Sequence, residues 1–373
     1  MLKYLLPLSV VFVAASAHAQ AKQDERPTPE AKQDERPTSD AKQNALPNIV
    51  ILATGGTIAG AGTGGHGYTS GQFKVEDLIA AAPGLDKLAN LKGEQVANIG
   101  SQDMNDQVWL KLAQRTNQLL QQPDVDGIVI THGTDTMEET AYFLDLVVKS
   151  DKPVVLVGSM RPATAISADG PGNLYDGVMA AASPGARGRG VLVVMNDKIF
   201  TARDITKTNT TSLDTMASLD RGPAGLVVES TGVTWFEPSN RRHTTKSEFS
   251  VEGRNQLPRV DIVYAHANMD ARLINAAINS GAKGIIVAGV GDGNMPKPAL
   301  DALTQAAKNG VVVVRSTRLP SGIVMRNAEV KDDEMGTVAS GELNPAKSRV
   351  LVQLALLSPR HSPNDVQRMF SEY

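Results

Sequence analysis

Two short segments of this chain combine threonine hydroxyls with glycine in a pattern that could support chemistry. They are residues 53–60 (ATGGTIAG) and residues 131–136 (THGTDT). Each follows an apolar, β-branched run, 48–52 and 126–130, of the kind that forms buried parallel strands. Ligands of open α/β sheets bind just beyond the carboxyl ends of the strands, so both hydroxyl clusters are expected at such a place. A threonine hydroxyl there can act as a nucleophile if a nearby group takes its proton.

The plain alternative is that these threonines cap helices. A threonine between a strand and a helix is most often an N-cap, whose side-chain oxygen accepts a hydrogen bond from the first turn. The second segment also contains an adjacent pair, Thr134 and Asp135, which adds a charged partner to the hydroxyl. From physical chemistry alone, capping and catalysis are then about equally favoured.

The two segments resemble the two signature motifs of the bacterial type II L-asparaginases and glutaminase-asparaginases, which are exported enzymes. The resemblance covers roughly residues 46–373 and includes further motifs in the same order. These are residues 96–105 (VANIGSQDMN), 137–144 (MEETAYFL), 160–162 (MRP), 167–170 (SADG), 204–210 (DITKTNT) and 343–349 (LNPAKSR).

The resemblance implies a set of catalytic residues. Thr57 resembles the primary nucleophile, and Tyr68, in the glycine-rich stretch 60–71, resembles a tyrosine that meets it when a mobile loop closes. Thr134 resembles a second catalytic hydroxyl, with Asp135 and Lys207 as its partners. A lysine can polarise or deprotonate such a hydroxyl, directly or through water.

The resemblance also implies how a substrate is held. The substrate-binding group of the family corresponds here to Ser101, Gln102, Thr134 and Asp135. In such a group, a hydroxyl suits an α-carboxylate and a carboxylate suits an α-ammonium.

Asn294 and Glu329 match positions that reach into the active site of a neighbouring subunit in the family. The expected assembly is therefore a homotetramer with active sites at dimer interfaces. In the family, Asn at the position of Asn294 accompanies a preference for asparagine, and Ser accompanies tolerance of glutamine. Glu329 would add a negative group near the substrate ammonium.

Composition and charge argue against several classes of function. Aromatic residues make up only 4% of the chain, which leaves few rings on which nucleic-acid bases could stack. The formal net charge is −3 and no long run of Lys or Arg occurs, so duplex DNA binding is not expected either. The chain has no cysteine, which excludes disulfides, a cysteine-linked lipid anchor and Cys-bound zinc. The six histidines lack metal-ligand spacing, so no metal site is expected, and His132 is interpreted as a structural hydrogen-bonding residue.

The first 45 residues are expected to lie outside the folded protein. Residues 1–19 have a positive start, an apolar stretch and a small-x-small cleavage pattern, which is typical of a signal peptide. Residues 20–45 repeat the decapeptide AKQDERPTPE with small changes and contain no apolar periodicity, which favours a disordered, solvated spacer. The expected location is the periplasm, with no membrane attachment after the signal is removed.

The rest of the chain indicates two α/β domains with parallel sheets and crossover helices. A polar, irregular stretch, 236–257, is interpreted as the linker between them. The larger, doubly wound N-terminal domain would span 46–235 and a smaller, flavodoxin-like C-terminal domain 258–373. Expected strands are 48–53, 127–131, 153–158, 190–195, 226–229, 260–264, 284–288 and 311–315; expected helices are near 105–121, 135–149, 173–182, 271–280, 297–309 and 363–371.

The function that the resemblance implies is hydrolysis of L-asparagine to L-aspartate and ammonia through a threonine acyl-enzyme, with no cofactor. A minor activity on L-glutamine is left open. The competing interpretation is a periplasmic receptor that closes on an amino acid and releases it unchanged. A dinucleotide-binding loop is not favoured, although Gly60, Gly62 and Gly65 formally match its spacing, because the strand–turn–helix context is missing.

Overall fold

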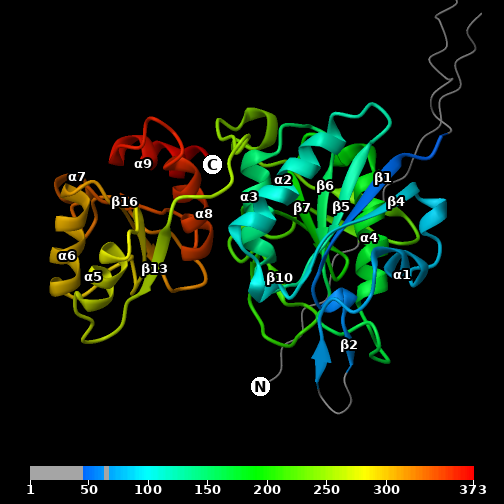
Figure 1. Cartoon of the computed structure of the whole chain (residues 1–373), viewed down its shortest axis with the longest axis horizontal. Helices are drawn as coiled ribbons and strands as arrows, with labels where there is room; N and C mark the ends of the chain where they lie inside the picture. The colour runs from blue at the N-terminus through cyan, green and yellow to red at the C-terminus, as the bar shows by residue number, and fades with distance from the viewer. Residues whose placement is uncertain (1–44, 63–66) are drawn as a thin grey trace, which may run out of the picture. The chain divides into compact units, whose positions relative to one another are not determined.

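The computed structural model describes residues 45–62 and 67–373, with the backbone alone at Tyr68 (Figure 1). The signal peptide expected at 1–19 and the spacer expected at 20–45 therefore lie outside the described residues, apart from Ala45. Within the described part of the chain, no helix is both long and apolar enough to span a bilayer.

The N-terminal part is built on an eight-stranded sheet in the order β12-β11-β8-β7-β6-β5-β1-β4. The strands from β4 to β7 run parallel, and β8, β11 and β12 are added antiparallel. The expected mostly parallel α/β class is confirmed. The strands are β1 (Asn48–Gly55), β4 (Asn90–Ile99), β5 (Gly127–Thr131), β6 (Val154–Val157), β7 (Val191–Met195), β8 (Lys198–Thr201), β11 (Gly225–Val228) and β12 (Gly232–Trp235).

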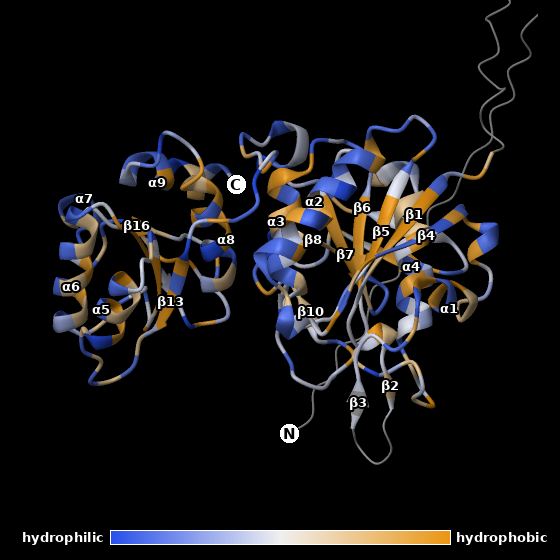
Figure 2. Ribbon diagram, in the orientation of Figure 1, coloured by the Kyte–Doolittle hydropathy of each residue, from blue (hydrophilic) through white to orange (hydrophobic). Residues whose placement is uncertain are grey.

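Helices cover both faces of this sheet, because its central strands are apolar on both sides. Along β1, Val50 and Leu52 point into one core and Ile49 and Ile51 into the other, as the two-residue period of a strand requires. The first core is covered by α2 (Asp106–Leu120) and α3 (Met137–Val147), and the second by α1 (Val75–Ala80) and α4 (Gly170–Ala182). Figure 2 shows the resulting apolar strands between helices with polar outer faces.

The C-terminal part is a smaller parallel sheet in the order β13-β14-β15-β16. The class is confirmed, but the strands follow one another in chain order, which is not the 2-1-3-4-5 order of a flavodoxin-like sheet. The strands are β13 (Val260–Tyr264), β14 (Gly284–Gly289), β15 (Val312–Thr317) and β16 (Val338–Ala339). The helices are α5 (Arg272–Asn279), α6 (Lys297–Lys308), α7 (Asp332–Met335), α8 (Pro345–Ala355) and α9 (Pro363–Glu372).

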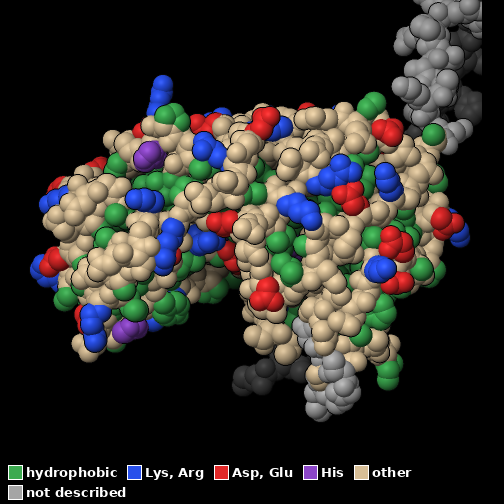
Figure 3. Space-filling view, in the orientation of Figure 1, with side chains coloured by type: hydrophobic (Ala, Val, Ile, Leu, Met, Phe, Trp, Pro, Cys, Tyr) green, Lys and Arg blue, Asp and Glu red, His purple; other side chains and the backbone are tan. Residues whose placement is uncertain are grey.

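Short elements occupy the loops around the strand ends. Two hairpins, β2 (Ala61–Gly62) with β3 (Tyr68–Thr69) and β9 (Thr206–Lys207) with β10 (Met216–Ala217), stand apart from the main sheets. The 3₁₀ turns are η2 (Thr57–Ala59), η3 (Leu85–Lys87), η4 (Ser101–Asp103), η5 (Pro184–Ala186) and η6 (Thr244–Lys246). On the face drawn in Figure 3, basic and acidic side chains are interspersed, so this face carries no patch of a single sign.

Candidate active site

The two threonine-rich segments meet at the ends of adjacent strands. β1 and β5 are parallel neighbours with Ala53 opposite Thr131, and the Thr54 hydroxyl donates to the Thr131 carbonyl at 2.8 Å. A Cβ atom on Gly56 would lie 2.4 Å from the backbone nitrogen of Gly133, and Gly56 has a φ of +81°. The two backbones therefore touch, and only glycine allows this approach at position 56.

Thr57 follows this contact directly and opens η2, where it is buried. The turn through Gly55 and Gly56, both with positive φ, carries the chain away from the sheet and leaves Thr57 just beyond the carboxyl end of β1. This is the position in which open α/β sheets bind ligands.

Thr134, Asp135 and Lys207 form a hydrogen-bonded group. The Lys207 ammonium donates to Thr134 Oγ1 at 2.9 Å and to Asp135 Oδ1 at 2.6 Å. The Thr134 hydroxyl itself lies 3.5 Å from Met160 Sδ, a weak acceptor. A lysine ammonium in this position can polarise the hydroxyl.

Ser101 is fixed to the loop that follows β5. Its hydroxyl oxygen accepts a hydrogen bond from the backbone N–H of Asp135 at 3.1 Å, and its carbonyl accepts one from Thr136 Oγ1 at 2.8 Å. The Ser101 oxygen also packs against Gly133, where a Cβ would lie 2.6 Å from it. Gln102 is exposed and turns back over Gly100.

A second group of the expected site residues lies in the C-terminal part. The Asn294 side-chain amide donates to Glu329 Oε2. Asn294 comes from the loop between β14 and α6, and Glu329 from the loop between β15 and α7. The structure thus brings Asn294 to Glu329, and separately brings Thr134 to Asp135, Lys207 and Ser101. The Tyr68 backbone lies in β3, and its side chain is outside what the structure describes.

A buried ion pair holds the two loops that carry Asn294 and Glu329. The Arg315 guanidinium forms a bidentate pair with Asp332 at 2.7 Å for both bonds, and it also donates to the carbonyls of Asp292 and Met325 at 2.9 Å. One buried side chain therefore fixes both loop backbones. Nothing in the local sequence around Arg315 signals this, because all of its partners lie at least ten residues away.

His132 supports the site without belonging to its polar group, as expected for a structural histidine. It is fully buried, with Nδ1 2.7 Å from the Gly133 carbonyl and Nε2 2.9 Å from Thr140 Oγ1. Burial lowers the pKa of His132 to about 4, so the ring is neutral. Nδ1 then donates to Gly133, and Nε2 accepts from Thr140, which in turn accepts from the Trp109 indole at 2.8 Å.

Asp169 shapes the loop that places Met160 beside Thr134. Its carboxylate accepts hydrogen bonds from the backbone N–H groups of Met160 and Arg161, both at 2.9 Å. Arg161 reaches Ser167 in turn. The motifs at 160–162 and 167–170 are thus the two sides of one loop, a role that their spacing alone did not indicate. The described residues contain no cluster of three or more acidic or histidine side chains suited to a metal ion.

Comparison with known proteins gives two family matches. Residues 48–241 match the family model described as "Asparaginase, N-terminal", and residues 259–370 match "Glutaminase/Asparaginase C-terminal domain". The chain is 53% identical to "L-asparaginase 2" of Escherichia coli, over 88% of this chain and 94% of that protein. It is 53% identical to "Probable L-asparaginase periplasmic" of Haemophilus influenzae, over 88% and 93%. With "Glutaminase-asparaginase" of Pseudomonas fluorescens it shares 47% identity, over 88% and 91%.

Proposed function

Because this chain belongs to the asparaginase family, we propose that it hydrolyses L-asparagine to L-aspartate and ammonia. The observation that supports this proposal most directly is the bond from Lys207 to Thr134, at a strand end adjacent to the one that bears Thr57. A hydroxyl held by a lysine beside a second buried hydroxyl is suited to acyl transfer. Relatives named glutaminase-asparaginase support a further, weaker activity on L-glutamine.

In the proposed reaction, the hydroxyl oxygen of Thr57 attacks the side-chain amide carbon of the substrate. The C–N bond breaks, the nitrogen leaves as ammonia with the proton that the hydroxyl gave up, and an ester to the enzyme forms. Water then attacks the ester carbon, which releases aspartate and restores the hydroxyl. Thr134, with Lys207, supplies the second hydroxyl and the proton relay.

Substrate binding is assigned to the charged and hydroxyl groups around Thr134. The Asp135 side chain is 56% exposed while bound to Lys207, so its carboxylate can also meet a substrate α-ammonium. Ser101 and Gln102 would contact the α-carboxylate. No step of this scheme needs a cofactor.

The test is ammonia release from L-asparagine and L-glutamine, side by side, by the wild-type protein and by Thr57→Ala and Thr134→Val. Each variant should lose roughly a thousandfold or more in kcat, because it removes one member of a coupled unit. Thr304→Val, on α6, is the matched control and should keep its activity, since that hydroxyl only bonds Leu300 within its own helix. Near-normal turnover in either folded site variant would exclude the two-threonine mechanism. Binding of amino acids without ammonia release would instead favour a receptor.

We further propose a homotetramer in which Asn294 and Glu329 complete the active site of a neighbouring subunit. Thr57→Ala and Glu329→Ala, each nearly inactive alone, should recover activity when the two variants are expressed together. A mixed dimer then has one site with both changes and one site with neither. Absence of recovery in proven mixed oligomers, or a fully active monomer in light scattering, would contradict a shared site.

The proposed location is the periplasm, after removal of residues 1–19. The relative from Haemophilus influenzae is named as periplasmic, which supports this proposal. Sequencing of the mature amino terminus from a cell fraction should find Gln20 first.

A further inference from the structure

Helix α8 of the C-terminal part begins against the segment that leads to Lys207. Asn344 caps this helix, and its side-chain oxygen accepts a hydrogen bond from the backbone N–H of Lys347 at 2.9 Å. Helical side chains lean toward the helix amino terminus, so the long Lys347 side chain extends past the cap. It is only 3% exposed.

The Lys347 ammonium is held by backbone carbonyls. It donates to the Arg203 carbonyl at 2.7 Å and also to the Ile205 carbonyl. Burial lowers the pKa of Lys347 to about 8, while the negative charges of Glu138 and Asp204 oppose this shift. A buried cation is costly unless its donors are satisfied, and here the two carbonyls accept from two of the three N–H donors of the ammonium.

The two carbonyls belong to Arg203 and Ile205, which precede the proposed catalytic residue Lys207 in the chain. Ile205 precedes β9, in which Thr206 and Lys207 are the two residues. The cap residue Asn344 also approaches Thr206, with 3.4 Å between its amide nitrogen and Thr206 Oγ1. The first turn of α8 therefore contacts the chain at three of the four positions before Lys207.

The same turn also reaches the helix that follows Thr134. The Asn344 amide nitrogen lies 3.4 Å from Glu138 Oε1, and Glu138 is in the first turn of α3. Helix α8 thus contacts both chain segments that supply the Lys207–Thr134 hydrogen bond, whose two residues are 73 positions apart in the sequence.

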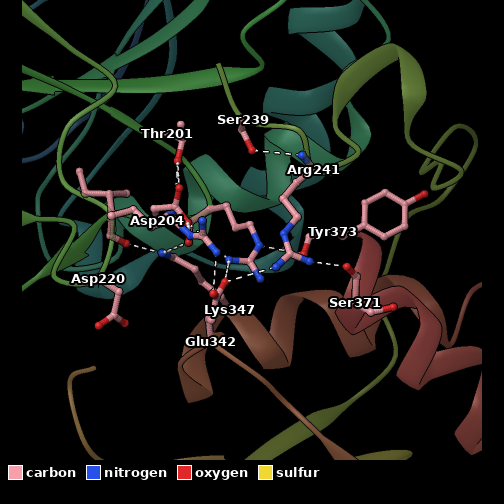
Figure 4. Close-up of polar contacts among 12 residues, drawn as sticks. Thr201, Asp204, Asp220, Ser239, Arg241, Glu342, Lys347, Ser371 and Tyr373 are labelled. Carbon is pink, nitrogen blue, oxygen red and sulfur yellow. Dashed lines mark hydrogen bonds and ion pairs between the residues drawn. The ribbon is translucent and has the colours of Figure 1, made fainter. Parts of the chain in front are cut away.

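A separate set of side chains anchors Arg203 itself, and Figure 4 labels two of its partners, Glu342 and Tyr373. Its guanidinium donates to Glu342 at 2.9 Å and to the main-chain oxygen of Tyr373 at 2.8 Å, and Arg221 and Arg241 also pair with Glu342. Loss of the Lys347 ammonium would leave these bonds in place. The expected effect of losing the ammonium is therefore a shift of Ile205 and β9, while Arg203 stays anchored.

We propose that Lys347 is a positioning residue for Lys207. By binding the carbonyls of Arg203 and Ile205, it fixes β9 so that the Lys207 nitrogen stays at hydrogen-bond distance from Thr134 Oγ1. Lys347 takes no part in proton transfer, and the inference rests on the function proposed for Lys207.

The test is a double-mutant cycle on ammonia release from L-asparagine, with Lys347→Met, Lys207→Met and the double variant. Misplacement of a catalytic group by about 1 Å can cost on the order of a hundredfold in rate, so Lys347→Met should lower kcat by tenfold or more. Its KM should change less than twofold, because the substrate-binding side chains are untouched. In the Lys207→Met background, the Lys347→Met change should cost nothing further.

The matched control is Arg349→Met on the same helix. Arg349 also donates to a backbone carbonyl, that of Val260 at 3.1 Å, and lies 3.9 Å from Glu139 of α3, but it does not bind the segment before Lys207. Its kcat should stay within about twofold of wild type.

If Lys347→Met does not fold, Lys347→Gln carries the same cycle. It keeps an N–H donor on a shorter side chain, so a smaller loss in kcat is expected, and this loss should again vanish in the Lys207→Met background. Equal losses in both backgrounds, or an unchanged kcat in the folded single variant, would show that Lys347 only joins the domains. Full activity of Lys207→Met would instead refute the proposed role of Lys207.

Discussion

At the scale of single residues, the charged and the neutral groups of the candidate site differ in their exposure to solvent. Lys207 and Asp135 form an ion pair that is partly open to solvent, whereas the hydroxyls of Thr57 and Thr134 are buried. His132, which contacts the Gly133 carbonyl, is kept neutral by burial. The ring therefore orients the Gly133 loop without adding a positive charge near the proposed nucleophiles.

The neutral state of His132 makes stability depend on pH. Its pKa is about 4 when folded, against an ordinary value of 6.5, so between these values the unfolded chain binds more protons than the folded one. The free energy of unfolding should thus fall as pH drops, by about 2 kcal/mol from pH 7 to pH 5 for this residue.

Urea unfolding of wild type and His132→Gln at both pH values measures this effect. The variant should be less stable at pH 7 but should show a weaker pH dependence by about 2 kcal/mol. Other groups with shifted pKa, such as Asp145, contribute equally to both proteins and cancel in the comparison. Parallel pH dependences would mean that His132 is not buried as a neutral ring.

Substrate choice between asparagine and glutamine is also decided by a single residue, in our interpretation. The two substrates differ by one methylene, which a pocket alone distinguishes by only about 1–3 kcal/mol. Asn294 is bonded to Glu329, so a shorter side chain at 294 would free that carboxylate to move. Asn294→Ser should raise the ratio of glutamine to asparagine kcat/KM without abolishing asparagine turnover.

The control for this variant is Asn309→Ser, at the end of α6, which should leave the ratio unchanged. Equal kcat/KM for both substrates in the wild-type protein would show that Asn294 does not confer a preference.

At the scale of elements, the site depends on how closely two strand ends approach. A turn follows the carboxyl end of both β1 and β5, and the backbones of the two turns are in contact at Gly56 and Gly133. Neighbouring parallel strands place such turns side by side, but the contact itself needs positions without a Cβ atom. The separation of Thr57 from Thr134 is therefore set by glycine.

Gly56→Ala should abolish most activity, whereas Gly222→Ala should not. Both glycines have a positive φ, +81° and +76°, so both substitutions strain the backbone. Gly56 also has a ψ of −174°, a combination that is essentially restricted to glycine. Only at Gly56 would the new Cβ meet backbone atoms, at 2.4 Å; at Gly222 nothing lies within 4 Å. Ammonia release and melting temperature of the two variants measure the difference. Equal activity would show that the strand ends can separate without loss.

At the scale of the whole molecule, the folded part is tied together from its first described residues. The Leu46 carbonyl accepts a hydrogen bond from the Asn90 side chain at 3.1 Å, and the Asn48 backbone N–H donates to Asp126 at 2.8 Å. The repeats that precede these residues carry charge and proline but no apolar pattern that could dock on a surface.

A protein that begins at Leu46 should therefore match one that begins at Gln20 in activity and melting temperature. Both properties are measured on the two purified proteins under the same conditions. A clear loss of either in the shorter protein would show that the spacer contacts the domain.

The sequence by itself determined the features that depend on local patterns. Apolar, β-branched runs are enough to identify buried strands such as β1, β5 and β14, because such strands need apolar side chains on both faces. Since the carboxyl ends of parallel strands share one edge of the sheet, the placement of both threonine clusters followed as well. The edge strand β4 was missed, because most of its side chains are exposed or half-buried and alternate without a clear apolar face.

Tertiary structure alone decided which distant residues meet. Three hydrogen bonds of the site and its surroundings join positions between 35 and 144 residues apart. They are the bonds from Lys207 to Thr134, from Asn294 to Glu329 and from Lys347 to the Arg203 carbonyl. No local pattern encodes such contacts, because each joins segments that come together only when helices such as α8 pack and when side chains such as Arg315 bind two loops at once. The chemistry at the strand ends is thus readable from residue types, but its geometry comes from packing between segments remote in sequence.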